Sequence, residues 1–133
     1  MDKKYLAQII ATDKEGLQMI SACTAGARVK VADIKYLASN KVFLLSIERN
    51  KIETNQENKK IKSICRFDFV DKVKSKNINQ KNDELFLELI AINHLKNKND
   101  YEINLIFNNN SHIALTTETI EVRLEDQNEI KQV

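Results

Sequence analysis

The sequence lacks proline and tryptophan altogether, and glycine occurs in its 133 residues only at positions 16 and 26. So few glycines cannot build the Gly-rich loop that cradles a phosphate group, and the nucleophile elbow of serine hydrolases is absent as well. Turns must therefore be formed by Asn, Asp, Ser and Lys, of which asparagine best tolerates the left-handed backbone region.

Histidine and cysteine are almost as scarce, with two of each. We expect His94 at the end of one strand and His112 at the start of another, with the strand 101–107 between them. In a meander these positions lie at opposite ends of the sheet, roughly 20 Å apart, so they should not share a metal ion. Cys23 and Cys65 fall on apolar faces, which is typical of buried thiols.

Carboxylates are the remaining candidates for catalysis. Asp33 lies in a predicted hairpin strand, and Asp68 and Asp71 flank a predicted bend, but their spacing does not indicate an acid–base pair across a cleft. We therefore predict a protein that is not an enzyme, with no catalytic residue, metal ligand or cofactor. An enzyme with an unrecognised site is the alternative.

The bulk composition favours a globular protein. Hydrophobic residues make up 42% of the sequence and charged residues 30%, with a formal net charge of +2. The length suits a single domain over residues 1–133. No apolar run is long enough to span a bilayer, and the stretch 5–11 is too short for a cleavable signal. We predict a cytoplasmic protein that does not insert into a membrane.

Hydrophobic spacing predicts the secondary structure. Leu17, Ile20 and Cys23 share one helical face, so we expect a helix over 13–25 that ends at Gly26. A period of two dominates most of the remaining sequence. The strands that it predicts span residues 5–11, 28–37, 42–52, 61–75, 85–95, 101–107 and from 113 onward, with polar loops over 50–60 and 77–83.

Consecutive hairpins favour an antiparallel meander. We predict an α+β fold, mainly antiparallel β, in which a curled sheet or small barrel surrounds the N-terminal helix; a pleckstrin-homology-like barrel is one concrete version. The strand 85–95 should be central, apolar on both faces and covered by the helix. The strand 61–75 needs a bend, which we place at Phe69 and Val70, with Phe69 on the core face. Residues 118–126 suit a strand or a helix, and a short helix is favoured.

Basic residues are concentrated between positions 59 and 81, where eight of them face only Asp68 and Asp71. Such a basic edge can bind phosphate backbones, or it can protect an edge strand from aggregation. No exposed aromatic residue is interleaved to stack on bases, so protection is favoured over nucleic-acid binding. The basic residues are Lys59, Lys60, Lys62, Arg66, Lys72, Lys74, Lys76 and Lys81.

An ion-pair cluster is expected on the same stretch. Arg66 and Asp68 lie two residues apart and so share one strand face, and Arg49 in the preceding strand is placed to reach it. Such a cluster can bind a ligand or can be purely structural. The candidate binding residues are Arg49, Arg66, Asp68, Lys72, Lys74 and Lys76.

Several segments recur in the order of a known family: 13–34, Tyr36-Leu37, Arg49, Arg66-Phe67-Asp68, 73–78 and Leu89-Ile90-Ala91-Ile92. Together they resemble a bacterial family called domain of unknown function 2948. The sequence departs from it at Asn77, where the family has glycine, at the turn Asn108-Asn109-Asn110, and at Ala114, where arginine is expected. The resemblance covers nearly the whole chain and implies one cytoplasmic domain. It supplies no mechanism.

These observations lead to a non-catalytic binding or adaptor domain as the expected function. The curled sheet would present the strand of Arg66 and Asp68, together with the basic turn 74–76, to a protein or an anionic ligand. Nucleic-acid binding by the basic 59–81 edge is the alternative.

Overall fold

The computed structural model describes residues 8–50, 60–82 and 84–129; the predicted loop residues 51–59 and the strand residues 5–7 lie outside this part. The described chain forms one α-helix, α1 (Lys14–Thr24), one 3-10 turn, η1 (Ala38–Asn40), and nine strands. The strands are β1 (Gln8–Ala11), β2 (Ala27–Leu37), β3 (Val42–Asn50), β4 (Lys60–Phe67), β5 (Val70–Lys76), β6 (Phe86–Lys96), β7 (Tyr101–Phe107), β8 (His112–Thr117) and β9 (Val122–Glu129). The prediction of a mainly antiparallel sheet with an N-terminal helix is confirmed.

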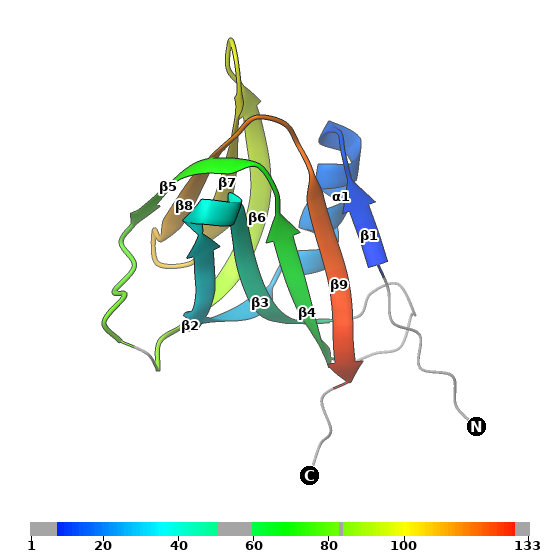
Figure 1. The fold of residues 1–133 in the computed structure, drawn as a ribbon. Coiled ribbons are helices and arrows are strands. Elements are labelled where there is room, and N and C mark those ends of the chain that lie inside the picture. Colours follow the sequence, from blue (N-terminus) through cyan, green and yellow to red (C-terminus); the bar gives the residue numbers. More distant parts are fainter. Residues whose placement is uncertain (1–7, 51–59, 83, 130–133) are drawn as a thin grey trace, which may run out of the picture.

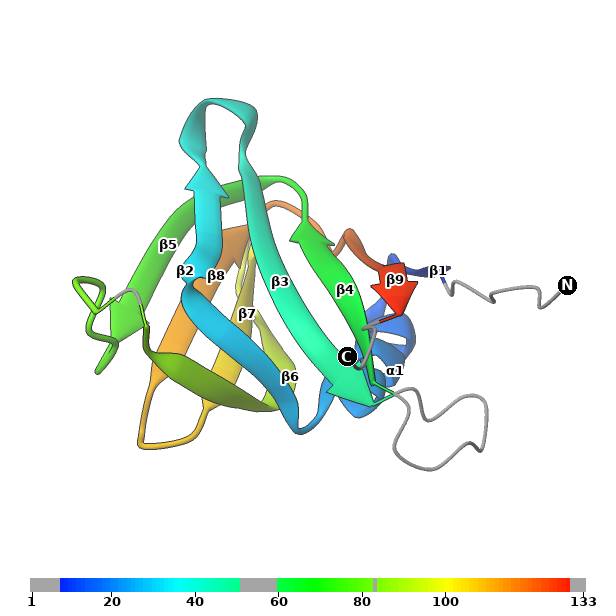
Figure 2. The ribbon, with the colours of Figure 1, turned by 90° about the horizontal axis from the view of Figure 1, so that it is seen from below.

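The nine described strands form one antiparallel sheet, in the order β1-β9-β4-β3-β2-β6-β7-β8-β5. Figures 1 and 2 show how this sheet curls around its inner face. The hairpins β2-β3-β4 and β6-β7-β8 follow the predicted meander. The chain then passes directly from β4, an interior strand, to β5 at the far edge, so a simple meander is wrong at this connection.

The curl brings the start of β5 back to the end of β2. The Val70 N–H donates a hydrogen bond to the Lys41 carbonyl over 2.8 Å. The Tyr36 hydroxyl donates to the Val70 carbonyl, also over 2.8 Å. Beyond this tie, β2 and β5 are not neighbours in the sheet, which is therefore unclosed on this side.

Helix α1 covers part of the inner face. It begins after Asp13, whose carboxylate accepts a hydrogen bond from the Gly16 N–H over 2.8 Å. Leu17 on its apolar side is fully buried. The Ser21 hydroxyl accepts a hydrogen bond from the Ile92 N–H over 2.9 Å, which fixes the helix against β6. The predicted helix and its contact with this strand are confirmed.

Alternate residues of the long strands point inward and form the core. On β3 these include Phe43 and Leu45, and the Phe67 ring of β4 meets Phe43 edge to face with centroids 5.9 Å apart. Burying a side chain of this size contributes about 1.5–3 kcal/mol. Cys65 is buried among them, and Cys23 is buried on α1, as predicted.

The predicted strand 61–75 is in fact two strands. Phe69, between them, has a φ of 58° and so lies in the left-handed region, and its side chain is 43% exposed rather than on the core face. Segment 118–121 supplies the partners of this turn: the Asp68 N–H donates to the Glu121 carbonyl, and the Glu118 N–H donates to the Phe69 carbonyl. The bend was predicted at this position, Phe69 and Val70, but its effect on strand order was not.

The C-terminal segment is strand β9, and the favoured short helix over 118–126 is wrong. Ile120 and Leu124 are four residues apart, as in a helix, but Val122 between them is buried as well. β9 lies between β1 and β4, so a period of two buries these side chains and pairs the backbone on both sides. On β6, the helix covers the inner face alone, because Ile90 on the outer face is 48% exposed.

Candidate binding surface

Arg66 and Asp68 form the ion pair expected from their spacing, with 3.0 Å between Arg66 Nε and Asp68 Oδ1. Arg66 is half exposed on the outer face of β4, where it registers with Leu44 of β3 and Arg123 of β9. β4 has a strand on both sides, so this pair sits in the middle of a sheet face rather than at an edge. Asp68 partly neutralises the Arg66 guanidinium, which lies beside the like charge of Arg123.

Arg49 is on the opposite face from Arg66, so the expectation that it joins this cluster is wrong. It points inward and is 1% exposed. Its Nη2 donates to both carboxylate oxygens of Asp126, over 2.9 and 3.2 Å, and its Nε lies 3.1 Å from Ser63 Oγ. The Ser63 hydroxyl donates to Asp126 Oδ1 over 2.7 Å. This buried network joins β3, β4 and β9 and has a structural role.

Lys72, Lys74 and Lys76 line up on the outer face of β5, the last strand of the sheet. All three are exposed, and their alternation places them about 6.7 Å apart along the strand. The nearby carboxylates Asp71 and Glu118 are instead bound to Lys41, at 2.9 and 3.7 Å. These carboxylates raise the pKa of Lys41, with Asp71 the larger cause. Within the described residues, the three lysines of β5 form no ion pair. We name them the β5 lysine row.

The basic stretch 59–81 does not form one continuous edge. Lys62 and Arg66 are on the interior strand β4, whereas the β5 lysine row is on the edge strand. Lys59 lies outside the described residues. The interpretation as a lysine-protected edge strand therefore applies to β5 alone.

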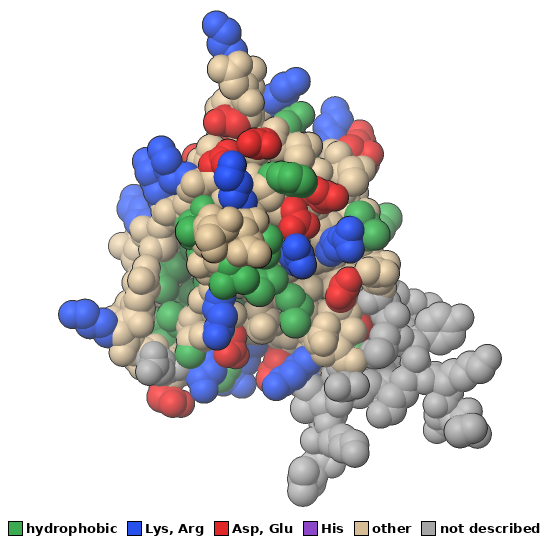
Figure 3. Space-filling model, in the orientation of Figure 1, with side chains coloured by type: hydrophobic (Ala, Val, Ile, Leu, Met, Phe, Trp, Pro, Cys, Tyr) green, Lys and Arg blue, Asp and Glu red, His purple; other side chains and the backbone are tan. Residues whose placement is uncertain are grey.

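A pocket of about 540 Å³ opens between β2 and β5, on the unclosed side of the sheet. Figure 3 shows hydrophobic side chains in the hollow beside β2 and basic side chains near the end of β5. Two polar side chains at the rim bond to each other, because Gln80 Nε2 donates to Ser75 Oγ over 3.0 Å. The apolar lining consists of Val31, Ala32, Ile34, Tyr36, Phe43, Val73, Ile78 and Ile113.

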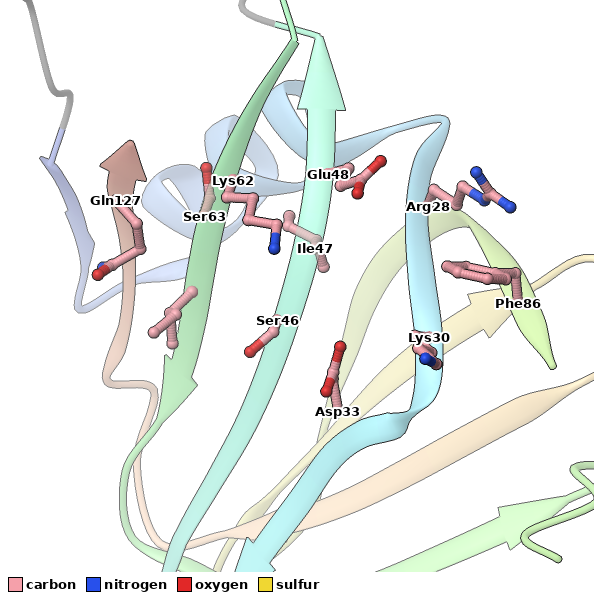
Figure 4. A pocket seen from close by; sticks show the side chains of 11 residues that line it. Arg28, Lys30, Asp33, Ser46, Ile47, Glu48, Lys62, Ser63, Phe86 and Gln127 are labelled. Carbon is pink, nitrogen blue, oxygen red and sulfur yellow. The ribbon is translucent and has the colours of Figure 1, made fainter. Parts of the chain in front are cut away.

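A second hollow, of about 440 Å³, lies on the outer face where β2 separates from β3. The separation arises because residues 30–33 of β2 stand opposite Ser46 alone. Figure 4 shows Arg28 beside the Phe86 ring, with the guanidinium carbon 3.7 Å from the ring centroid. Charges of both signs line this hollow, namely Arg28, Lys30 and Lys62 with Asp33 and Glu48. It therefore offers donors and acceptors together and selects no single class of ligand.

The two histidines lie on the two strands that flank β7. His94 of β6 registers with Ile103 and His112 of β8 with Ile106, so they are offset by three residues, about 10 Å, along β7, rather than by its full length. The odd offset places the two side chains on opposite faces of the sheet, although both residues line one broad hollow. His112 Nε2 lies 2.8 Å from Asn104 Oδ1. In the described part of the chain, no group of three or more potential ligands could hold a metal ion.

Cys65 is unsuited to nucleophilic chemistry. It is fully buried, and burial raises the pKa of its thiol to about 12. The nucleophilic thiolate is therefore almost unpopulated near neutral pH. Cys65 contributes to the core rather than to a site.

These features define a class of protein, an unclosed antiparallel sheet around one helix, with a basic edge strand beside a pocket whose lining side chains are mostly apolar. The chain belongs to the family described as Protein of unknown function (DUF2948), whose model matches residues 7–132. The resemblance seen in the sequence is thereby confirmed over nearly the whole chain. No curated protein and no solved structure matches it. Among the residues that the structure describes, no helix combines the length and the apolar character needed to cross a membrane.

Sequence reasoning found the β5 lysine row but missed the three hollows described above. The pocket between β2 and β5 combines residues from four strands and from the segment after β5, so no local pattern marks it. Val73, Ile113 and Ile34 meet only because the chain crosses from β4 to β5, which the sequence did not predict.

Proposed function

We propose that this chain is a non-catalytic binding domain of the bacterial cytoplasm, and that the β5 lysine row binds an acidic protein partner. The observation that carries this proposal is the position of the row on the last strand of an unclosed sheet. Lysine side chains there are exposed along one line, and the neighbouring carboxylates are already occupied by Lys41. Long-range attraction from such a row speeds the encounter with an acidic surface.

Arg66 and Asp68 fall outside this surface in the proposal. β4 is an interior strand, and the Arg66 cation is already paired with Asp68. An exposed pair of this kind contributes at most about 1 kcal/mol. The curled sheet itself serves as the scaffold, in the manner of a pleckstrin-homology-like small barrel with one open side.

Affinity capture with a charge-reversed variant tests the proposal. The variant carries Lys72→Glu, Lys74→Glu and Lys76→Glu, which moves the formal net charge from +2 to about −4 because each reversal changes it by two. The matched control reverses three exposed lysines elsewhere, Lys14, Lys60 and Lys98. We expect partners that the wild type and the control capture to be lost from the β5 variant.

Equal capture by all three proteins would refute the proposal and leave the lysines as protection of an edge strand. Capture that depends on nucleic acid, with an affinity falling by a log–log slope of about −0.9 per phosphate contact as salt rises, would instead favour the nucleic-acid alternative.

A further inference from the structure

The free side of β5 is the starting point. β5 pairs with β8 along one edge, and β8 is its one hydrogen-bonded neighbour among the strands that the structure describes. Its other edge is tied to the rest of the fold at Val70, by the Lys41 carbonyl and the Tyr36 hydroxyl. Past that tie, five residues, Lys72–Lys76, present an edge about 17 Å long. An edge of this kind is a template for one more strand.

The facing edge of β2 is also incomplete. Ala27–Lys30 pair with β6, and the Val31 N–H donates to the Leu85 carbonyl over 3.0 Å. The following part of β2, from Ile34 to Leu37, is paired with β3 on one side. The pocket of about 540 Å³ lies between this part of β2 and β5. Its size is in the range of about 300–1,000 Å³ that is usual for ligand sites.

The side chains that line the pocket suit apolar groups, whereas its backbone edges, unpaired within the described residues, suit an added strand. Its polar side chains are already satisfied, because Gln80 donates to Ser75 and the Tyr36 hydroxyl donates to Val70. Burying a further polar group there without a partner would be costly. Apolar side chains on the floor, including the buried Phe43 and Ile113, offer contact area instead.

On the outer face of the sheet, an added strand would need acidic residues, because it would lie beside the β5 lysine row. Residues of an added strand that lie on the same face as the β5 lysine row would be direct cross-strand neighbours, with Cβ atoms about 4.5–5.5 Å apart. Carboxylates at every second position match lysines at every second position. A second copy of this chain fits poorly, because pairing β5 with β5 would place the two lysine rows side by side.

We propose that β5 binds an extended segment of a partner protein as an additional strand, in which acidic residues alternate with apolar ones. The acidic residues face the β5 lysine row, and the apolar residues enter the pocket between β2 and β5. This inference rests on the proposed function and names its partner chemistry. Three lysines spread over about 13 Å suit several carboxylates on a peptide better than the single head group of an anionic amphiphile.

The test uses the whole chain and the peptide acetyl-Glu-Val-Glu-Val-Glu-Val-Glu-amide. Control peptides are acetyl-Glu-Glu-Glu-Glu-Val-Val-Val-amide, with the same composition in blocks, and the alternating peptide with Ser in place of Val. Affinity is measured by isothermal titration, and amide hydrogen exchange of β5 by NMR. We expect both control peptides to bind at least tenfold more weakly, and exchange at Val73 and Ser75 to slow at least tenfold with the alternating peptide alone.

Two protein variants complete the test. Ala32→Trp fills the pocket from an exposed position, and should weaken the alternating peptide at least tenfold while its thermal unfolding remains cooperative. Ala32→Ser is the matched control and should bind like the wild type. The triple β5 variant used for capture should lose the peptide as well.

If the alternating and block peptides bound equally well, and Ala32→Trp weakened neither, strand addition would be refuted. The proposed function would still stand if the triple β5 variant lost the captured partners. No binding of the alternating peptide at low salt would also overturn the inference, whatever capture shows. Laurate that binds more tightly than the peptide, and that Ala32→Trp excludes, would assign the pocket to a free amphiphile. Concentration-dependent dimers abolished by Ala32→Trp would assign it to a second copy.

Discussion

The buried network of Arg49, Ser63 and Asp126 allows a quantitative prediction. Arg49 and Asp126 have side chains that are 1% and 0% exposed, and two bonds of 2.9 and 3.2 Å join Nη2 to the carboxylate. Removing one partner takes the opposite charge away from a buried ion, which typically costs about 3–5 kcal/mol. We therefore expect Arg49→Met and Asp126→Val each to lower the free energy of unfolding by about 3–5 kcal/mol.

The double variant should behave differently from the sum. Replacing both charges by apolar side chains of similar volume is often neutral or stabilising, because no charge then needs to be desolvated. Because the Ser63 hydroxyl would lose Asp126 as its acceptor, the reference protein and all variants of this cycle also carry Ser63→Ala. We expect Arg49→Met with Asp126→Val to lie within about 2 kcal/mol of that background, which corresponds to a coupling energy of several kcal/mol.

Urea unfolding at pH 7, followed by circular dichroism, measures these differences, and an unchanged denaturant slope would show that the unfolding reaction is the same. The control cycle is Arg66→Met with Asp68→Asn on the outer face, where the Arg66 side chain is 51% exposed. Its coupling should be below about 1 kcal/mol. If the two inner substitutions were additive, with the double variant losing about 6–10 kcal/mol, the reasoning from desolvation would be refuted.

Three further predictions concern single positions. Because burial raises the pKa of Cys65 to about 12 from an ordinary value near 9, its contribution to stability is complete below pH 9 and is lost as the pH rises toward 12. Over that range the wild type should lose about 1.4 kcal/mol per pH unit more than Cys65→Ala in urea titrations, and equal slopes would contradict this. Gly16→Ala should lower the melting temperature although alanine favours helices, because the new Cβ would lie 2.9 Å from Ala11 Cα. The exposed Gln18→Ala is the control, and an unchanged melting temperature for Gly16→Ala would argue against a tight contact. Phe69→Gly should be more stable than Phe69→Val by about 1–2 kcal/mol, because φ is 58° there, and the reverse order in urea would disprove backbone strain.

Local periodicity predicted most of the elements but not their arrangement. The helix was predictable because Leu17, Ile20 and Cys23 repeat with the helical period and are all buried. The length of segment 61–75 predicted a bend at Phe69 and Val70, but not a division into two separate strands, because apolar alternation runs unbroken through Cys65, Phe67 and Phe69, and no glycine marks the left-handed residue. Strand order past this turn follows from tertiary pairing, which a local pattern cannot encode.

The misplacement of Arg49 has a simpler physical cause. Phe43, Leu45 and Ile47 alternate inward on β3, and Arg49 continues the same parity. The pattern therefore indicated an inward side chain, but a charge was assumed to face solvent. Its compensation comes from Asp126, which is 77 residues away in the sequence. The sequence predicted the β5 lysine row because exposed charge on an edge strand needs no distant partner.

The pairing of β1 with β9 determines when the sheet can be finished. Gln8 registers with Glu125, and Gln8 Nε2 donates to Glu125 Oε1 over 2.6 Å across a sequence separation of 117 residues. Closing so long a loop costs chain entropy before any contact compensates for it, and proteins rich in such distant pairings fold in about milliseconds to seconds. During synthesis, β1 must remain without its strand partner until β9 has left the ribosome. The hairpins β2-β3 and β6-β7 can form well before that moment.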